Sequence, residues 1–168
     1  MFLSILVVVA PSINVIVFTN AGRTPLCSRQ IKKLFGTVDI EIAEYYNEES
    51  LFGNIISNPA TTYFFIINSS KHVQHLVDRA HPYSTVRSIY VHCETPQLVQ
   101  QRRLARNYSK LNAVFGDPLR LLIKLIMDLG LFCQETADRQ KDDASLIEAA
   151  RRNYQRSIGL YGFAESMV

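Results

Sequence analysis

The sequence contains few motifs that indicate a catalytic or binding chemistry, and the motifs that it lacks exclude several classes of protein. Its three cysteines are odd in number and far apart, and none of them forms a C-x-x-C pair. This argues against a disulfide framework and favours reduced intracellular thiols. Neither G-x-G-x-x-G nor G-x-x-x-x-G-K-[ST] occurs, so the usual dinucleotide and P-loop signatures are missing. Long internal repeats and low-complexity segments are also absent.

Neither positive nor negative charge dominates the sequence, because 18 lysine and arginine residues nearly balance 15 aspartate and glutamate residues. The resulting net charge of +3 is too small to indicate a nucleic-acid partner. Hydrophobic residues make up 48% of the 168 residues and charged residues 20%, which is the balance of a globular protein. A chain of this length buries enough surface to fold without disulfides or metals.

The apolar N-terminus lacks the usual marks of a targeting or membrane-spanning segment. No basic residue precedes residues 1–10, and Pro11 interrupts them well before the roughly 20 apolar residues that a spanning helix needs. We therefore expect an extra edge strand or a buried arm here, and a cytoplasmic protein. A targeting or anchoring role for residues 1–20 is the alternative.

What the sequence does contain is a strand–helix–strand pattern across residues 86–117. Residues 88–93 are rich in β-branched and aromatic side chains, which are typical of a strand. Pro96 stands where the first turn of a helix tolerates proline, and residues 111–115 form a second short apolar run. A strand that returns through a helix to another strand is the unit of a parallel α/β sheet.

The rest of the chain repeats this alternation. Further strands are expected at residues 13–18, 38–46 and 61–67, and helices at residues 27–35, at residues 48–56 and after a Ser69 or Ser70 cap. Strict alternation at the start of residues 38–46 indicates an edge strand, and the apolar run of residues 61–67 indicates a central one. Five strands alternating with helices predict a three-layer, doubly wound α/β fold. Its mostly parallel sheet is expected in the flavodoxin-like or receiver-like order 2-1-3-4-5.

A long helix is expected after Asp117, which would cap it, with Pro118 in its first turn. Residues 119–133 are apolar on nearly every side of this helix. A helix that is apolar on most faces must be covered on most faces. The sheet can cover only one of them, so another element has to cover the rest.

The last segment of the chain is the candidate cover. Residues 134–143 are polar, as at a helix end or in a linker, and Ser145 with Glu148 has the capping-box spacing of a new helix. We therefore expect an α/β domain at residues 1–133. A C-terminal helical extension at residues 134–168 would pack on it or lead to a following domain.

In a doubly wound sheet, ligands bind beyond the carboxyl ends of the strands, where the strand order reverses. Small polar residues follow the expected strands, and backbone N–H groups at helix starts favour phosphate. The candidate ligand-binding or phosphate-binding residues are Asn20, Asn68, Ser69, Ser70 and Glu94. Such residues are equally well explained by helices and turns that need capping groups, without any ligand.

An active response-regulator receiver has this fold, but its chemistry requires other residues. Carboxylates after the first strand hold the metal, and an aspartate after the third strand accepts the phosphoryl group. Here the first strand ends in Thr19-Asn20, the third in Asn68 and the fourth in Cys93. These residues exclude receiver chemistry and leave a receiver-shaped domain without it.

Two other chemistries have isolated residues but no complete pattern. His72 and His75 would share one helix face and, together with Cys93, would suit zinc. Unrelated surface histidines are the commoner explanation. Cys93 beside His92 resembles a nucleophile and its base, but no third group that would orient them is identifiable. The sequence therefore supports no catalytic residue, no metal ligand and no cofactor.

Two sets of residues are candidates for partner binding. The basic set would lie on a solvated helix face or bind an acidic protein or RNA. It comprises Arg102, Arg103, Arg106 and Lys110. The apolar set lies on the last two expected helices and comprises Leu122, Ile126, Tyr154, Ile158 and Tyr161.

One long run of the chain carries a resemblance to a known group of proteins: SIYVHCETPQLVQQRRLARNYSKLNAVFGDPLRLLIKLIMDL. It is similar to the N-terminal α/β domain of certain metazoan multidomain proteins. There an S-I-Y-V-x-C strand and a helix precede a K-[VIL]-x-[AG]-V-F-x-D strand and turn. Those proteins continue into tetratricopeptide repeats or an arginine ADP-ribosyltransferase domain.

The resemblance spans roughly residues 60–135 and consists mostly of core positions. It implies no catalytic residue in this chain, because the activity of that family lies in the domain that follows. Residues 149–158 look like part of one tetratricopeptide helix. A single helix of that kind cannot bury its own apolar face, so the resemblance implies packing on further helices.

The sequence thus predicts a non-catalytic, receiver-like module that mediates protein–protein association within a larger intracellular protein. Its partner would be another protein or an adjacent domain that binds the C-terminal helices, with self-association as a further option. Nucleic acid and membranes are disfavoured. The alternative is a nucleotide-dependent enzyme or binding domain, either flavodoxin-like or cleaving NAD as TIR domains do, through Glu48 or Glu94. A deep pocket at the strand ends would favour this alternative.

Overall fold

The computed structural model describes residues 12–168 and contains a five-stranded parallel sheet. Its strands are β1 (Ser12–Thr19), β2 (Glu41–Tyr45), β3 (Thr61–Asn68), β4 (Val86–His92) and β5 (Leu111–Phe115). They lie in the order β2-β1-β3-β4-β5, and every neighbouring pair is parallel. This confirms the predicted doubly wound fold and its strand order. The edge strand or arm expected at residues 1–10 lies outside the described residues.

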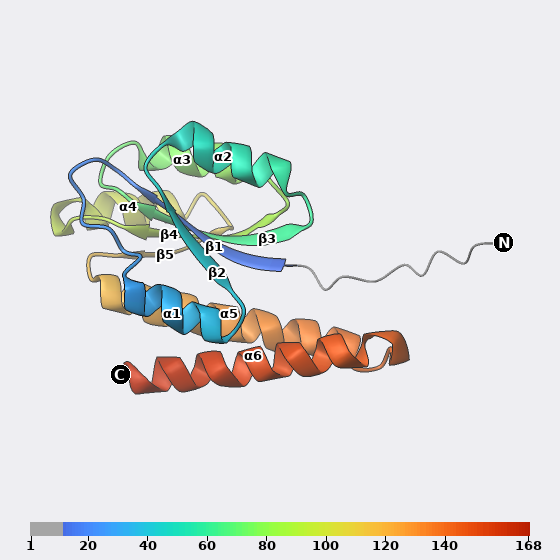
Figure 1. Cartoon of the computed structure of the whole chain (residues 1–168). Helices are drawn as coiled ribbons and strands as arrows, with labels where there is room; N and C mark the ends of the chain where they lie inside the picture. The colour runs from blue at the N-terminus through green and yellow to red at the C-terminus, as the bar shows by residue number, and fades with distance from the viewer. Residues whose placement is uncertain (1–11) are drawn as a thin grey trace.

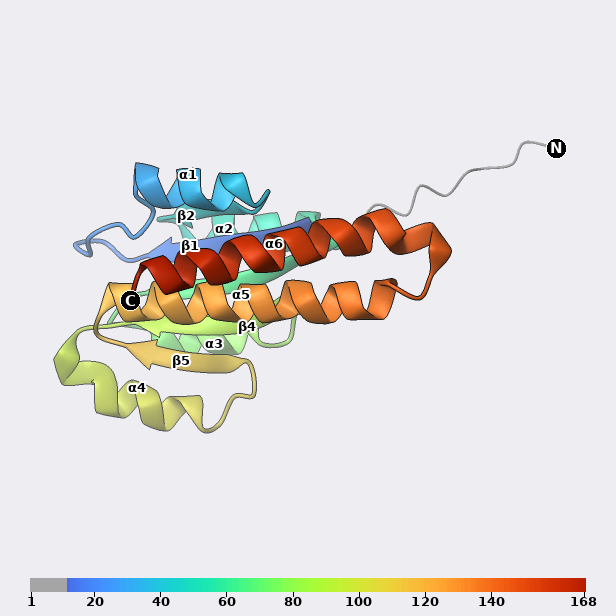
Figure 2. The ribbon, with the colours of Figure 1, turned by 90° about the horizontal axis from the view of Figure 1, so that it is seen from below.

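Helices cover both faces of the sheet (Figure 1). One face carries α2 (Glu48–Ser57), α3 (Val73–Ala80) and α4 (Leu98–Ala105), and a short 3-10 helix at Thr95–Gln97 leads into α4. The other face carries α1 (Arg29–Thr37) and α5 (Pro118–Gln140). α6 (Ile147–Ser166) follows a 3-10 turn at Ala144–Leu146 and runs along the seam between α1 and α5 (Figure 2). α6 therefore adds a further layer on one side of the sheet.

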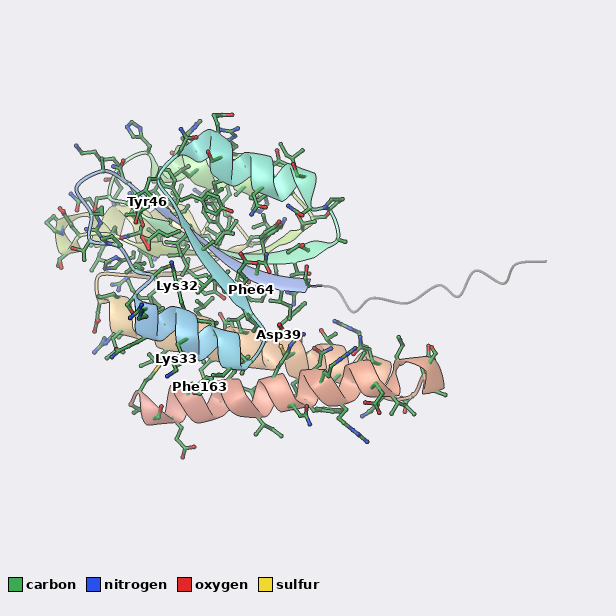
Figure 3. All side chains as sticks on the ribbon, viewed as in Figure 1. Lys32, Lys33, Asp39, Tyr46, Phe64 and Phe163 are labelled. Atoms are coloured by element: carbon green, nitrogen blue, oxygen red, sulfur yellow. The ribbon has the colours of Figure 1, made fainter. Side chains whose placement is uncertain are left out.

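The core consists of two apolar layers that the sheet separates. β3 is central and buried along nearly all of its length, as its continuous apolar run predicts. Successive side chains alternate between the layers. Phe64 lies on the α1 and α5 side (Figure 3), where its ring packs on Phe132 with centroids 5.6 Å apart. Phe65 faces the other layer and packs edge-on against Phe52 of α2.

The second strand starts later than its alternating pattern predicts. Residues 38–40 form a turn after α1, in which the Val38 and Ile40 N–H groups both donate to the Phe35 carbonyl. Asp39 adopts a left-handed conformation in this turn, with a φ of 55°. Val38 and Ile40 are buried in the turn itself, so their alternation reflects burial there rather than pairing with β1, which begins at Glu41.

The predicted serine cap of the third helix is wrong. α3 starts after His72, and no side chain caps it. The Ser69 hydroxyl accepts a hydrogen bond from the Lys71 N–H at 3.0 Å and donates one to the Lys71 carbonyl at 2.7 Å. Because this serine closes a turn two residues long, its hydroxyl is not available to the helix.

The predicted cap of the long helix is confirmed, but the helix is longer than expected. The Asp117 carboxylate accepts the Leu119 N–H at 2.9 Å, and Pro118 occupies the first turn of α5. The helix continues to Gln140, so the boundary expected between residues 133 and 134 falls inside it. Before α6, Asp143 rather than Ser145 is the capping residue, since its carboxylate accepts the Ser145 N–H at 2.9 Å.

α6 covers the apolar side of α5 that the sheet leaves open. Leu160 and Ala164 of α6 are buried in the same cluster as the inward face of α5. A Cβ atom on Gly130 of α5 would lie 2.7 Å from the Tyr161 ring, so glycine permits this close approach. Arg156 ties α6 to the turn after α1 through an ion pair with Asp39 at 2.9 Å. Across residues 12–168, no helix combines the length and apolarity that crossing a membrane requires.

Candidate functional site at the carboxyl edge of the sheet

The carboxyl ends of three strands bring their last polar residues into one row. The strand register pairs Thr19 of β1 with Asn68 of β3, and Asn68 with His92 of β4. Asn68 is fully buried, and its amide donates to the Thr19 hydroxyl at 3.2 Å and to the Thr24 carbonyl at 2.9 Å. The row lies at the point where the strand order reverses, which is where this fold places its ligands.

Arg23, from the loop after β1, lies across this row. Its guanidinium donates to Asn68 Oδ1 at 3.3 Å and to both the ring Nδ1 and the carbonyl oxygen of His92, at 3.0 and 3.3 Å. It also pairs with the Glu94 carboxylate at 3.6 Å. The Arg23 side chain is only 15% exposed. Arg23 therefore covers the polar row at the edge of the sheet where doubly wound folds usually bind ligands.

The partners of His92 fix its protonation state. Nε2 lies 3.2 Å from the Gly116 carbonyl, which can only accept a hydrogen bond, and Nδ1 faces a guanidinium, which can only donate one. A neutral ring with its proton on Nε2 satisfies both. Burial, and then the charge of Arg23, lowers the pKa of His92 in agreement with this assignment. Asn68 Oδ1, 2.9 Å from Nδ1, would accept a hydrogen bond only if Nδ1 carried a proton, as it does in the other neutral tautomer and in the charged ring.

Glu44 of β2 closes the neighbouring part of the edge. Its carboxylate accepts hydrogen bonds from the Thr19 hydroxyl at 2.7 Å, the Leu26 N–H at 3.2 Å and the Cys27 N–H at 2.7 Å. The loop between β1 and α1 is thereby fastened to β2. Burial, followed by the charge of Glu44, raises the pKa of Cys27 to about 12. This thiol is held in its protonated, unreactive form.

The five ligand-binding candidates lie along this edge, but they bond to the protein itself. Asn68 and Ser69 are fully buried, and their polar groups are used in the row and in the turn described above. The Ser70 hydroxyl accepts the Glu94 N–H at 2.9 Å. The Asn20 N–H donates to the Asn68 carbonyl at 3.1 Å. The sequence predicts that the carboxyl ends of β1, β3 and β4 lie together, and the strand register shows this. It does not reveal the role of Arg23, which belongs to no recognisable motif.

The residues considered for other chemistries are also engaged elsewhere. Cys93 is fully buried, and burial raises its pKa, so it is a poor nucleophile. Within the described part of the chain, no three His, Cys, Asp or Glu side chains are placed to hold a metal ion. His75 contacts the Glu48 carboxylate at 2.7 Å. Although partial burial opposes the shift, hydrogen bonds from Arg79 and His75 lower the pKa of Glu48. Glu48 is thus an ionised member of an ion-pair cluster.

The basic set of candidates divides into two groups. Arg102, Arg103 and Arg106 are exposed on α4 and at its end. Lys110 lies beyond the helix, half-buried, and its Nζ donates to the His81 and Tyr83 carbonyls, both at 2.7 Å. Burial lowers the pKa of Lys110. Lys110 therefore fastens a loop and does not extend the basic surface, contrary to the prediction.

The apolar set of candidates divides in the same way. Leu122 and Ile126 are buried under α6 and belong to the core, so they cannot face a partner in this structure. Tyr154 and Tyr161 are half-buried. Ile158 is 72% exposed on the outer side of α6. Which side of each helix faces outward depends on where α6 docks, and the sequence pattern left that open.

Comparison with known proteins adds no further constraint, since no protein-family model, curated protein or solved structure matches the chain. The candidate site is therefore interpreted from its own geometry. A row of polar groups that bond to one another, beneath an arginine, stabilises the loops of the sheet.

Proposed function

We propose that the chain is a non-catalytic, receiver-like module that binds a protein partner through the outer face of α6, as part of a larger intracellular protein. The observation that carries this proposal is an apolar groove on that face, with a volume of about 300 Å³. We call it the α6 groove. Its lining residues are Lys141, Ile147, Ala150, Arg151, Tyr154, Gln155 and Ile158.

The apolar residues of the α6 groove follow one line along the helix. Ile147, Ala150, Tyr154 and Ile158 are separated by three or four positions, the spacing of neighbours on one helix face. Ile147 is 49% exposed and Ile158 72% exposed. Contiguous exposed apolar surface of this kind marks interaction sites more often than chance, whereas scattered apolar residues do not.

The charges around the α6 groove favour one kind of partner. Its charged lining residues are Lys141 and Arg151, which pair at 3.5 and 3.7 Å with the carboxylates of Asp138 and Glu148 beside the groove, and no carboxylate lines the groove itself. We propose that the occupant is an amphipathic helix of a protein partner, with an apolar stripe that fills the groove and flanking Asp or Glu residues. Residues 149–158 resemble a tetratricopeptide helix, and helices of that kind pack against other helices, which supports a helical occupant.

The carboxyl edge supports the non-catalytic half of the proposal. Arg23 fills the position where a nucleotide would bind, and its hydrogen bonds to Asn68 and His92 would have to break first. Within the described part of the chain, Cys27, Cys93 and Cys133 are unpaired, as expected of a reducing intracellular compartment.

Two synthetic peptides test the proposed partner chemistry. Each is about 18 residues long, with leucines at helical spacing, and the stripe is flanked by Glu in one and by Lys in the other. Fluorescence anisotropy with the full chain measures both affinities. We expect the Glu-flanked peptide to bind at least about 10-fold more tightly, because opposite charges across the interface favour binding and like charges oppose it.

A matched pair of variants locates the binding surface. Ile158→Asp places a charge in the α6 groove, and Ile56→Asp places one at a similarly exposed isoleucine of α2, on the other side of the sheet. We expect only Ile158→Asp to abolish peptide binding. Failure of both peptides to bind contradicts the proposal. Sedimentation that shows a dimer lost in Ile158→Asp would replace the partner helix with a second copy of the chain.

A further inference from the structure

A second depression lies on the opposite side of the sheet from α6, between the start of α3 and the outer part of α4. Its volume is about 410 Å³, within the range of small-molecule pockets. It is lined by residues of the loop into α3 and by residues of α4 and its C-terminal end, and none of its lining residues is acidic. It is separate from the row under Arg23, with which it shares none of the residues described above except Ser70.

The N-terminus of α3 opens into this depression. Ser70, His72 and Gln74 are among the lining residues. The first N–H groups of a helix have no partner within the helix, and no side chain caps α3. His72 precedes the helix in a left-handed conformation, with a φ of 57°. These N–H groups carry the positive end of the helix dipole, which attracts an anion.

Gln101 supplies an independent indication of a ligand. It is 93% buried, with 7% of its surface exposed, and it lines the depression. Its amide forms no hydrogen bond with any of the residues from 12 to 168. Among these residues, the enclosed side-chain atom without a partner is Gln97 Oε1, so the Gln101 amide reaches the surface, and the residue lines the depression. A largely buried amide without a protein partner is stabilised when a ligand bonds to it.

Arg103 completes the set of donors. Its side chain is exposed, lines the depression and forms no ion pair within the described part of the chain. A guanidinium that lines the same depression as the uncapped start of α3, with no carboxylate in the lining, is suited to a phosphate group.

We propose that this depression binds the phosphate monoester of a small polar molecule. The phosphate lies between the N-terminus of α3 and Arg103. The amides of Gln101 and Asn107, which also lines the depression, bond to hydroxyl or amide groups of the organic part. This site differs from the strand-end phosphate site considered from the sequence, because it uses helix α4 and lies away from Asn68. It is also independent of the α6 groove.

Amide NMR spectra of the labelled full chain test the site with ribose 5-phosphate, inorganic phosphate and ribose as probes. We expect both phosphates to shift the N–H signals of Val73, Gln74 and His75, and ribose alone to shift none. Ribose 5-phosphate should bind at least about fivefold more tightly than inorganic phosphate, because the amides add hydrogen bonds. The peptide experiments on the α6 groove do not depend on this result.

Arg103→Ala and Arg106→Ala remove the same charge from the same end of α4, but only Arg103 lines the depression. We expect Arg103→Ala to weaken binding of ribose 5-phosphate at least about 10-fold and Arg106→Ala less than about twofold. Gln101→Leu should reduce the preference for ribose 5-phosphate over phosphate. Equal losses in both arginine variants, equal affinity for the two phosphates, or unshifted α3 signals would each overturn the proposal.

Discussion

The side chains at the carboxyl edge of the sheet bond to one another, whereas those on the outer face of α6 are exposed. At the edge, Asn68, His92 and Glu44 bond to groups of the protein, and Arg23 lies over them. On α6, Ile147 and Ile158 are exposed in an apolar groove that no element of residues 12–168 covers. The polar groups of the first region have hydrogen-bond partners, whereas the apolar side chains of the second are not buried.

The contrast between these two regions shows that the position of a site in a fold does not establish its function. Doubly wound sheets bind ligands at their carboxyl edge, and the chain places polar residues there as the fold predicts. The same residues stabilise loops when they find partners among themselves. The unpartnered surface, rather than the usual location, is the better guide to where this protein binds.

The largest expected effect concerns the reactivity of Cys27 at the edge. With its pKa raised to about 12, mainly by burial, the thiol is almost fully protonated at pH 8. We expect iodoacetamide to alkylate it about 100-fold more slowly than a free cysteine, as mass spectrometry of timed samples will measure. Glu44→Gln should accelerate the reaction, because it removes the neighbouring negative charge. Reaction as fast as free cysteine would show that the edge is open.

Replacement of Arg23 tests whether the edge is structural. Arg23→Ala leaves Asn68 Oδ1 and the His92 ring without their donor. We expect a loss of about 2 kcal/mol in the free energy of unfolding, measured with urea. Arg120→Ala, at an exposed position, should cost less than about 0.5 kcal/mol. Stability unchanged by Arg23→Ala would mean that this arginine is free to bind a ligand.

Substitutions at two glycines with different surroundings test how α6 packs on α5. In Gly130→Ala the new methyl group meets the Tyr161 ring, whereas a Cβ atom on Gly162 meets nothing within 4 Å. We expect Gly130→Ala to destabilise the protein by about 1 kcal/mol. Gly162→Ala should stabilise it by about 0.5 kcal/mol, through helix propensity alone. Equal effects in thermal melts would indicate that α6 does not pack on α5 in solution.

A smaller effect concerns the pH dependence of stability at the edge. The pKa of His92 is lower in the folded protein than its ordinary value of 6.5, first because of burial and then because of Arg23. The fold therefore favours the neutral ring, and its contribution is fully present above pH 6.5 and is lost as the pH falls. Urea unfolding of wild type and His92→Gln should show their stability difference shrinking below pH 6.5. A difference that grew there would contradict the assigned neutral ring.

Much of the edge could be predicted from the sequence, and Arg23 could not. Apolar runs locate the strands, and parallel strands bring their carboxyl ends together, so the proximity of Asn68 to the β1 and β4 ends followed. Arg23 lies four residues beyond Thr19, in a loop. The hydrophobic pattern of a sequence does not predict the path of a loop. Its role depends on the Asn68 and His92 groups that it meets across the sheet.

The outer face of α6 was likewise only partly predictable. The apolar pattern of residues 119–133 required a covering helix, and α6 provides it. Which residues face inward depends on the docking of two helices, so Leu122 and Ile126 were grouped with Ile158 although they lie in the core. Gly130 lies opposite the Tyr161 ring and permits the close packing of the two helices. The spacing of apolar residues along one helix does not reveal such a contact between helices.

Amide NMR mapping with the Glu-flanked peptide tests the contrast between the two regions most directly. Our account predicts that the peptide shifts the signals of residues 147–158 and leaves those of Thr19, Asn68 and His92 unchanged. Shifts concentrated at the strand ends, with α6 unaffected, would contradict it.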